Sequence, residues 1–354
     1  MKSFLLVSMV FAVLILTLEA FLFGVYLANI GSINYIKDDG KDTHNNSHEW
    51  VVTKRNAVAT YLALYIYAEI YQVVLALITI YTRNIYHLVS SVGFLAAMCA
   101  YSGVQYSELH KTLINAEHQN WQTICQAISI AIIVIAVVLV INQAAIAWQL
   151  KDIFIQHTGE KTGMNTNLIK ANMFFNLHRN AVILSFFFFP AFTLQFIVIA
   201  LKRNDPEFII TVIVLVLSLF LLLLADFCAT RELLFPLLVL IVFYLGAIAY
   251  LLFKLIRLFT KYANQPGKRS LVVFDIFTLL LAFWLATITV VVISNFGKGL
   301  KKLYANNYSR HGVPIYPTMT QNSEISKVSA RKYTASGGDL YNPVAPPPRE
   351  QLDF

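Results

Sequence analysis

Long runs of apolar residues, separated by short polar segments, dominate this chain from its start to Asn295. A helix rises about 1.5 Å per residue, so about 20 apolar residues cross a hydrocarbon core of about 30 Å. The runs have this length and contain few charges, so they predict membrane-spanning helices. We expect eight spans: Phe4–Ile30, Ala57–Tyr81, Asn84–Ser107, Trp121–Trp148, Ala181–Leu201, Glu207–Asp226, Leu233–Phe253 and Val272–Ser294.

The fifth span has the most distinctive sequence. It contains four consecutive phenylalanines, Phe186 to Phe189, and has no polar face, as expected of a helix buried in lipid or among other helices. Pro190 follows and has no backbone N–H, so the carbonyl of Phe186 loses its helical hydrogen bond. In a membrane, such a freed group needs a donor from a neighbouring helix. The sequence therefore predicts that partner helices pack around this span.

Two segments depart from the pattern of spans and short loops. Gln149–Asn180 is the longest internal connection, and its short apolar pieces are typical either of helices at the membrane surface or of a solvated loop. Residues 296–354 lose the apolar runs and gain Pro, Ser, Gly, Asn and Tyr, a composition that predicts disorder. We therefore expect an all-α polytopic transmembrane bundle over residues 1–295 and a disordered polar tail over residues 296–354.

Composition supports the membrane class and argues against several others. Hydrophobic residues make up 58% of the chain and charged residues 13%, against about 25% charge in a soluble domain. The net charge of +8 comes mostly from short loops, where Lys and Arg contact lipid headgroups, and no basic stripe interleaved with aromatics indicates nucleic-acid binding. The expected partner is the lipid bilayer. The sequence contains no catalytic, phosphate-binding or metal-ligand pattern, so we expect no enzyme, cofactor or metal.

The orientation of the spans rests on one short motif. Lys and Arg occur in nearly equal numbers on the two sides, so their distribution does not decide it. Asn45-Asn46-Ser47 fits the glycosylation acceptor pattern, which places that loop in the lumen and both termini in the cytosol. The first span is far longer than the roughly 7–15 apolar residues of a signal peptide, so we expect an uncleaved anchor.

Glu19 and Glu69 are the acidic residues deepest within the predicted spans. Glu19 is 11 residues from Ile30, and Glu69 is 12 residues from Ala57, which places them roughly 16 and 18 Å from the same membrane face. Because the first two spans are consecutive and antiparallel, the two carboxyl groups can lie at one level. An ionisable group at this depth is costly and suggests a functional site.

Other polar residues follow helical spacing on three spans. Tyr65, Glu69 and Gln72 form a stripe on the second span, and Tyr101 and Gln105 form one on the third. Asp275 begins a seam of small and polar residues on the eighth span. Two interpretations remain open for this polar set. It either lines a cavity that binds a proton or cation, or it holds helices together through buried hydrogen bonds.

The tail contains two tetrapeptides of the kind that sorting adaptors bind. Tyr316 and Met319 enclose the first, and Tyr341 and Val344 enclose the second, with a bulky apolar residue three places after the tyrosine. An extended cytosolic strand is required for such docking, which the predicted tail would provide. The alternative is chance, because the tail is rich in tyrosine.

Four segments resemble an uncharacterised family of fungal multi-pass Golgi-apparatus membrane proteins: FFFFPAFTLQFIVIAL from Phe186, ATRELL from Ala229, LLFKLIR from Leu251 and NFGKGLK from Asn295. The resemblance covers spans two to eight and implies residence in the Golgi or neighbouring endomembranes. It implies no activity and no functional residue. We expect a non-enzymatic protein that acts in trafficking or compartment organisation, and a small-solute or proton-coupled transporter is the alternative.

Overall fold

A computed structural model describes residues 1–29, 46–114, 120–162, 166–201, 206–260 and 268–298, and these residues form eight α-helices. Each helix is long enough and apolar enough to cross a bilayer, which confirms the eight spans and the all-α transmembrane class. Asn45, the four sorting-signal residues and the tail beyond Lys298 lie outside the described residues. The helices are α1 (Lys2–Asn29), α2 (Asn46–Thr82), α3 (Ile85–Ile114), α4 (Asn120–Lys161), α5 (Thr166–Ile199), α6 (Pro206–Thr230), α7 (Leu234–Thr260) and α8 (Lys268–Ser294).

The helices α4 and α5 are longer than predicted. α4 continues through Trp148 to Lys161 and α5 begins at Thr166, so the prediction of surface helices or a solvated loop over Gln149–Asn180 is wrong. The 42 residues of α4 extend about 63 Å, roughly twice the thickness of a hydrocarbon core. A helix can continue with a polar sequence beyond the membrane surface. Hydropathy identifies only the part of the helix that lies within the lipid.

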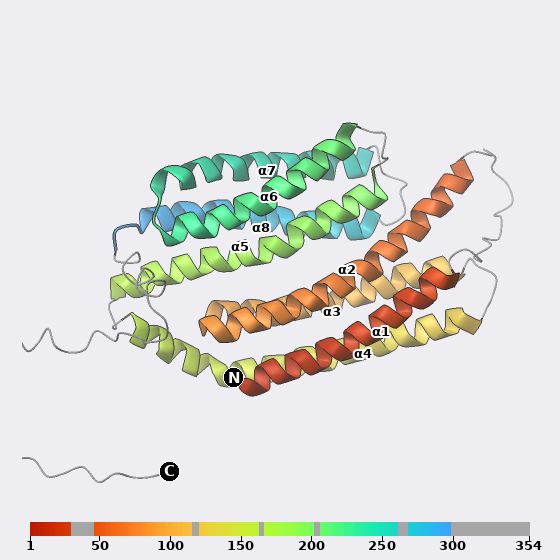
Figure 1. The fold of residues 1–354 in the computed structure, drawn as a ribbon, viewed down its shortest axis with the longest axis horizontal. Helices are drawn as coiled ribbons and strands as arrows, with labels where there is room; N and C mark the ends of the chain where they lie inside the picture. Colours follow the sequence, from red (N-terminus) through yellow and green to blue (C-terminus); the bar gives the residue numbers. More distant parts are fainter. Residues whose placement is uncertain (30–45, 115–119, 163–165, 202–205, 261–267, 299–354) are drawn as a thin grey trace, which may run out of the picture. The chain divides into compact units, whose positions relative to one another are not determined.

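The eight helices form two groups of four. In the first group, α1 packs against α2 and α4, and α3 packs against the same two helices, so the four close into a ring. In the second group, α5 and α7 each pack against α6 and α8 in the same way. Helix α5 also packs against α2 and, less extensively, α3, and it therefore joins the two groups (Figure 1).

The outer faces of the helices are apolar, and many polar side chains lie inside. Large side chains such as Val216, Leu223 and Val242 are 62–69% exposed, whereas Gln72, Gln143 and Gln195 are fully buried or nearly so. In water, so much exposed apolar surface would be unfavourable, but hydrocarbon chains solvate it. This distribution of side chains agrees with an integral membrane protein.

Helix α5 is more deeply buried than any other described span, as its phenylalanine run predicts. Its backbone also receives hydrogen bonds from neighbouring helices. The Tyr67 hydroxyl of α2 donates to the Phe186 carbonyl oxygen at 3.3 Å, the group that Pro190 leaves without its helical donor. The Tyr71 hydroxyl donates to the Ile183 carbonyl oxygen one turn earlier. The expected donor from a neighbouring helix is thus confirmed.

Tyr67→Phe is expected to lower the free energy of unfolding by about 1–3 kcal/mol, because the Phe186 carbonyl would be buried without a donor. The same change should cost much less in a Pro190→Ala background, since the alanine N–H restores the helical bond. Unfolding in mixed detergent micelles, followed by circular dichroism, measures both. Tyr81→Phe is the control, because Tyr81 is 90% exposed. Equal costs of Tyr67→Phe in the two backgrounds would contradict this role of Tyr67.

Candidate functional site

Glu19 of α1 and Glu69 of α2 lie inside the first group of helices. Their side chains are 0% and 2% exposed, and Glu69 is close enough to Glu19 to act on it electrostatically. Helix α1 ends at Asn29, and α2 starts on the same side of the bundle and runs in the opposite direction. This antiparallel arrangement is the one assumed when residues were counted from a shared membrane face to compare the depths of Glu19 and Glu69. The structure therefore places both acidic residues inside one group of helices, where they interact electrostatically, as their similar expected depths allow.

Three further side chains complete this site, which we call the acidic cluster: Glu19, Glu69, Tyr65, Tyr101 and Gln105. The Gln105 amide of α3 donates to Glu19 Oε1 at 2.8 Å. The rings of Tyr65 and Tyr101 are stacked with centroids 6.2 Å apart, and Tyr65 interacts electrostatically with both glutamates. Three helices thus contribute polar groups to one buried space, as the stripes on the second and third spans predict.

Several oxygen atoms of the acidic cluster have no hydrogen-bond partner in the described part of the chain. These are Glu19 Oε2, Glu69 Oε2, Gln105 Oε1 and the hydroxyl oxygens of Tyr65 and Tyr101. A buried polar atom without a partner costs about 1–3 kcal/mol, so helices held together only by polar contacts would be expected to satisfy them. Two buried carboxyl groups that interact electrostatically and have open oxygen atoms can instead hold a proton or a small cation.

Two other predicted site residues lie outside the acidic cluster. Gln72, one turn after Glu69, donates to Ser91 Oγ of α3 at 3.3 Å. Asp275 belongs to α8 in the second group of helices, where it is fully buried and neither of its carboxylate oxygens has a described hydrogen-bond partner. Its electrostatic neighbour is Lys254 of α7 rather than either glutamate.

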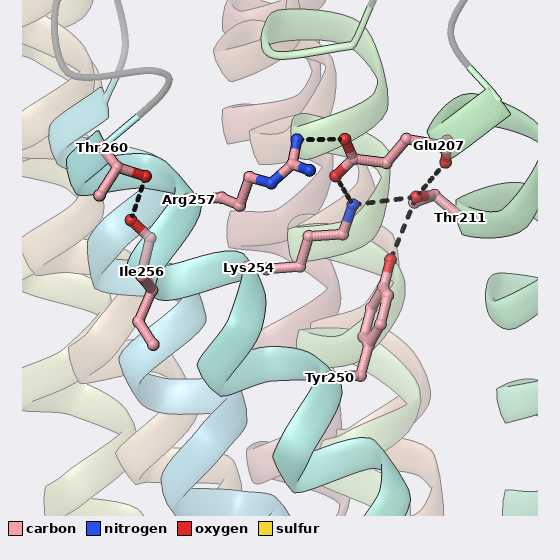
Figure 2. A network of polar contacts seen from close by, with 7 residues as sticks. All are labelled: Glu207, Thr211, Tyr250, Lys254, Ile256, Arg257 and Thr260. Carbon is pink, nitrogen blue, oxygen red and sulfur yellow. Dashed lines mark hydrogen bonds and ion pairs between the residues drawn. The ribbon is translucent and has the colours of Figure 1, made fainter.

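Lys254 belongs to a charged network that we call the Glu207 cluster: Glu207, Thr211, Tyr250, Lys254 and Arg257 (Figure 2). Lys254 Nζ is 2.5 Å from Glu207 Oε1 and 3.2 Å from Thr211 Oγ1, and it is 1% exposed. Arg257 Nη1 lies 2.9 Å from Glu207 Oε2, so one carboxylate binds two cations. The Tyr250 hydroxyl donates to Thr211 Oγ1 at 3.1 Å and completes the network.

The sequence interpretation missed the Glu207 cluster because it ended the seventh span at Phe253 and assigned Lys254 to the lipid headgroups. Helix α7 continues to Thr260, so Lys254 and Arg257 lie on one face, three residues apart. Glu207 is in the first turn of the preceding antiparallel helix, at the same end of the bundle. The sequence contained a signal for this cluster: Glu207 lies at the start of one span, and Lys254 and Arg257 lie near the end of the next.

A third polar cluster joins the start of α3 and the last turns of α6 to the first half of α5. Arg179 binds Asp226 through two hydrogen bonds of 2.8 and 2.9 Å. The Asn180 side-chain oxygen is 3.1 Å from His87 Nδ1 and accepts a hydrogen bond of 2.7 Å from Ser90 Oγ. These residues could not be paired from the sequence, because Arg179 and Asn180 were expected in a connection between spans rather than in α5.

Comparisons with known proteins point to one group of membrane proteins. The chain is 27% identical over 146 residues to a Schizosaccharomyces pombe protein named "UPF0658 Golgi apparatus membrane protein". The matched segment covers 40% of this chain and 41% of the relative. No protein-family model matches the chain, and no solved structure matches it. The resemblance to fungal Golgi-apparatus membrane proteins that the sequence motifs indicate is confirmed by this similarity.

Proposed function

We propose that this protein is a non-enzymatic integral membrane protein of the Golgi or a related endomembrane compartment, and that it acts there as a small-solute or proton-coupled transporter. The location is supported by the name of the fission-yeast relative. The transport activity is supported by one observation above others. Glu19 and Glu69 are both buried in the first group of helices and interact electrostatically, and one oxygen of each has no hydrogen-bond partner among the residues that the structure describes.

The physical reason lies in the low dielectric of the bundle interior. Two negative carboxylates that are both buried and interact electrostatically are unfavourable, so we expect at least one proton or cation to accompany them. Release of that ion on one side of the membrane and uptake on the other would couple its movement to a change between two arrangements of the helices. Gln105, which binds one oxygen of Glu19, leaves the other available for the ion.

A second candidate function is a role in trafficking or compartment organisation without transport. The name of the fission-yeast relative, which gives a compartment, is consistent with it. The tail tyrosines Tyr316 and Tyr341 would then recruit sorting adaptors. In this case the acidic cluster would serve only to hold α1, α2 and α3 together.

Glu19→Gln and Glu69→Gln are expected to abolish transport while leaving the fold intact, since glutamine keeps the shape and an acceptor oxygen for Gln105. In cells lacking the native chain, a lumen-targeted pH-sensitive fluorescent protein reports the pH of the compartment. Each variant should reproduce the pH change caused by deletion. Glu160→Gln is the control, because Glu160 is an exposed carboxyl at the end of α4, and it should restore normal pH.

Normal lumenal pH in cells carrying either glutamine variant would remove the proposed transport activity. If deletion then still misplaces cargo proteins, and the glutamine variants restore their location, the trafficking role is the better description. Elution of each variant as a single species in detergent shows that a loss of activity does not come from unfolding.

A further inference from the structure

A groove of about 780 Å³ lies between α3 and α8, near the end of the bundle that holds the Glu207 cluster. Ala100, Gly103 and Ser107 of α3 form one wall, and Val272 and Val273 of α8 form part of the other. The groove belongs to neither the acidic cluster nor the Glu207 cluster, so the proposed function does not use it.

The groove exists because small residues line the outward face of α3. Ala100 and Gly103 are both exposed, and a Cβ atom added at Gly103 would meet nothing within 4 Å. Helices α3 and α8 belong to different groups and are held apart by α5, which packs against both. In a bilayer, an apolar hollow of this kind on the outer face is filled by hydrocarbon chains.

Two cations lie at the open end of this apolar hollow. Lys268 and Arg269 are the first two residues of α8 and line the groove, together with Phe259 of α7. Lys268 Nζ lies 4.5 Å from the centroid of the Phe259 ring, which holds the ammonium group at the groove. Glu108 is the acidic residue in the lining, and its Oε1 lies 3.2 Å from Lys111 Nζ, which offsets its charge.

The dimensions of the groove fit a phospholipid. From Glu108 at the charged end to Ala100 at the apolar end, α3 rises about 12 Å, which is most of one leaflet of a hydrocarbon core about 30 Å thick. An acyl chain can therefore lie along Gly103 and Val272 while the headgroup remains at the level of Lys268 and Arg269. Guanidinium and ammonium groups at this level favour a phospholipid whose headgroup carries a net negative charge over a phospholipid whose headgroup is zwitterionic.

We propose that the α3–α8 groove is a binding site for an anionic phospholipid, with one acyl chain in the groove and the headgroup on Lys268 and Arg269. Purified full-length protein in detergent, mixed with phosphatidylserine or phosphatidylcholine of identical acyl chains, provides the test. Native mass spectrometry then measures the bound fraction of each lipid. The unmodified chain should retain phosphatidylserine in preference to phosphatidylcholine.

Variants separate the contribution of the headgroup from that of the acyl chain. Lys268→Gln and Arg269→Gln are each expected to lower the preference for phosphatidylserine about fivefold. Lys170→Gln is the control, because Lys170 is an exposed lysine of α5 and does not line the groove. Gly103→Leu should reduce binding of both lipids by filling the hollow. Its control is Gly93→Leu, because Gly93 of α3 is also exposed, does not line the groove, and an added Cβ there also meets nothing within 4 Å.

Equal retention of the two lipids by the unmodified chain would overturn the proposal, and so would an unchanged preference in both cation variants. Displacement of the lipid by excess glycerophosphoserine, which has no acyl chains, would show a headgroup site alone and also contradict it. A dimer that binds no lipid, and that Gly103→Leu converts to a monomer, would assign the groove to a second copy of the chain.

Discussion

Lys254→Met is expected to lower the free energy of unfolding by about 3–5 kcal/mol, as found when one member of a buried ion pair is removed. Lys254 is the cation of two carboxylates: it binds Glu207 directly and acts electrostatically on Asp275. Glu207 would keep Arg257, whose side chain is 33% exposed, but Asp275 has no other described partner. The loss therefore leaves a buried carboxylate without a compensating charge.

A second substitution tests whether Asp275 is the source of this cost. Asp275→Asn removes the negative charge, so the double variant with Lys254→Met should recover much of the lost stability. Lys170→Met is the matched control, since Lys170 is exposed, and it should stay within about 0.5 kcal/mol of the unmodified chain. Unfolding in mixed micelles measures all four proteins. An unchanged midpoint for Lys254→Met would show that the Glu207 cluster adds nothing to stability.

The eight spans could be predicted from the sequence because the bilayer imposes a simple rule. Every peptide group in hydrocarbon must find its partner within a helix, so each crossing appears as an unbroken apolar run. The rule stops at the membrane surface. Residues 149–161 of α4 and 166–180 of α5 are helical but polar, and hydropathy alone gave no reason to extend either helix.

The same contrast applies to the polar sites. Glu19 and Glu69 were matched by counting residues from a shared membrane face, which works because α1 and α2 are consecutive and antiparallel. The interaction between Asp275 and Lys254 joins α8 to α7, and hydropathy does not determine how these two helices align along their lengths. A lysine near the end of a span is usually expected to reach the lipid headgroups. The residues around Lys254 in the sequence do not show that its side chain instead points into the bundle toward Glu207.

Phe187→Ala is expected to lower the free energy of unfolding by about 3–5 kcal/mol, the usual cost of emptying a phenylalanine site in a packed core. The Phe187 ring is fully buried at the junction of the two groups of helices. Its centroid lies 5.1 Å from that of Tyr67 and 5.3 Å from that of Tyr71, both in α2, and 4.8 Å from that of Phe94 in α3.

The matched control is Phe235→Ala, because Phe235 is 77% exposed at the start of α7. Lipid chains can occupy the space that the Phe235 ring leaves, whereas no lipid reaches Phe187, so its contacts are lost outright. In a membrane the helices gain little from the hydrophobic effect once inserted, and packing of this kind must hold the two groups together. Equal costs for the two variants would mean that the junction is not held by these rings.

A double-mutant cycle with Phe94→Ala isolates the contact between α3 and α5. The rings of Phe94 and Phe187 meet edge to face at an interplanar angle of 88°, an arrangement worth about 0.5–1.5 kcal/mol beyond the area it buries. The two substitutions should therefore cost less together than the sum of their separate costs. Additive costs would assign the junction to the tyrosines of α2, whose hydroxyl groups already bind the backbone of α5 around Pro190.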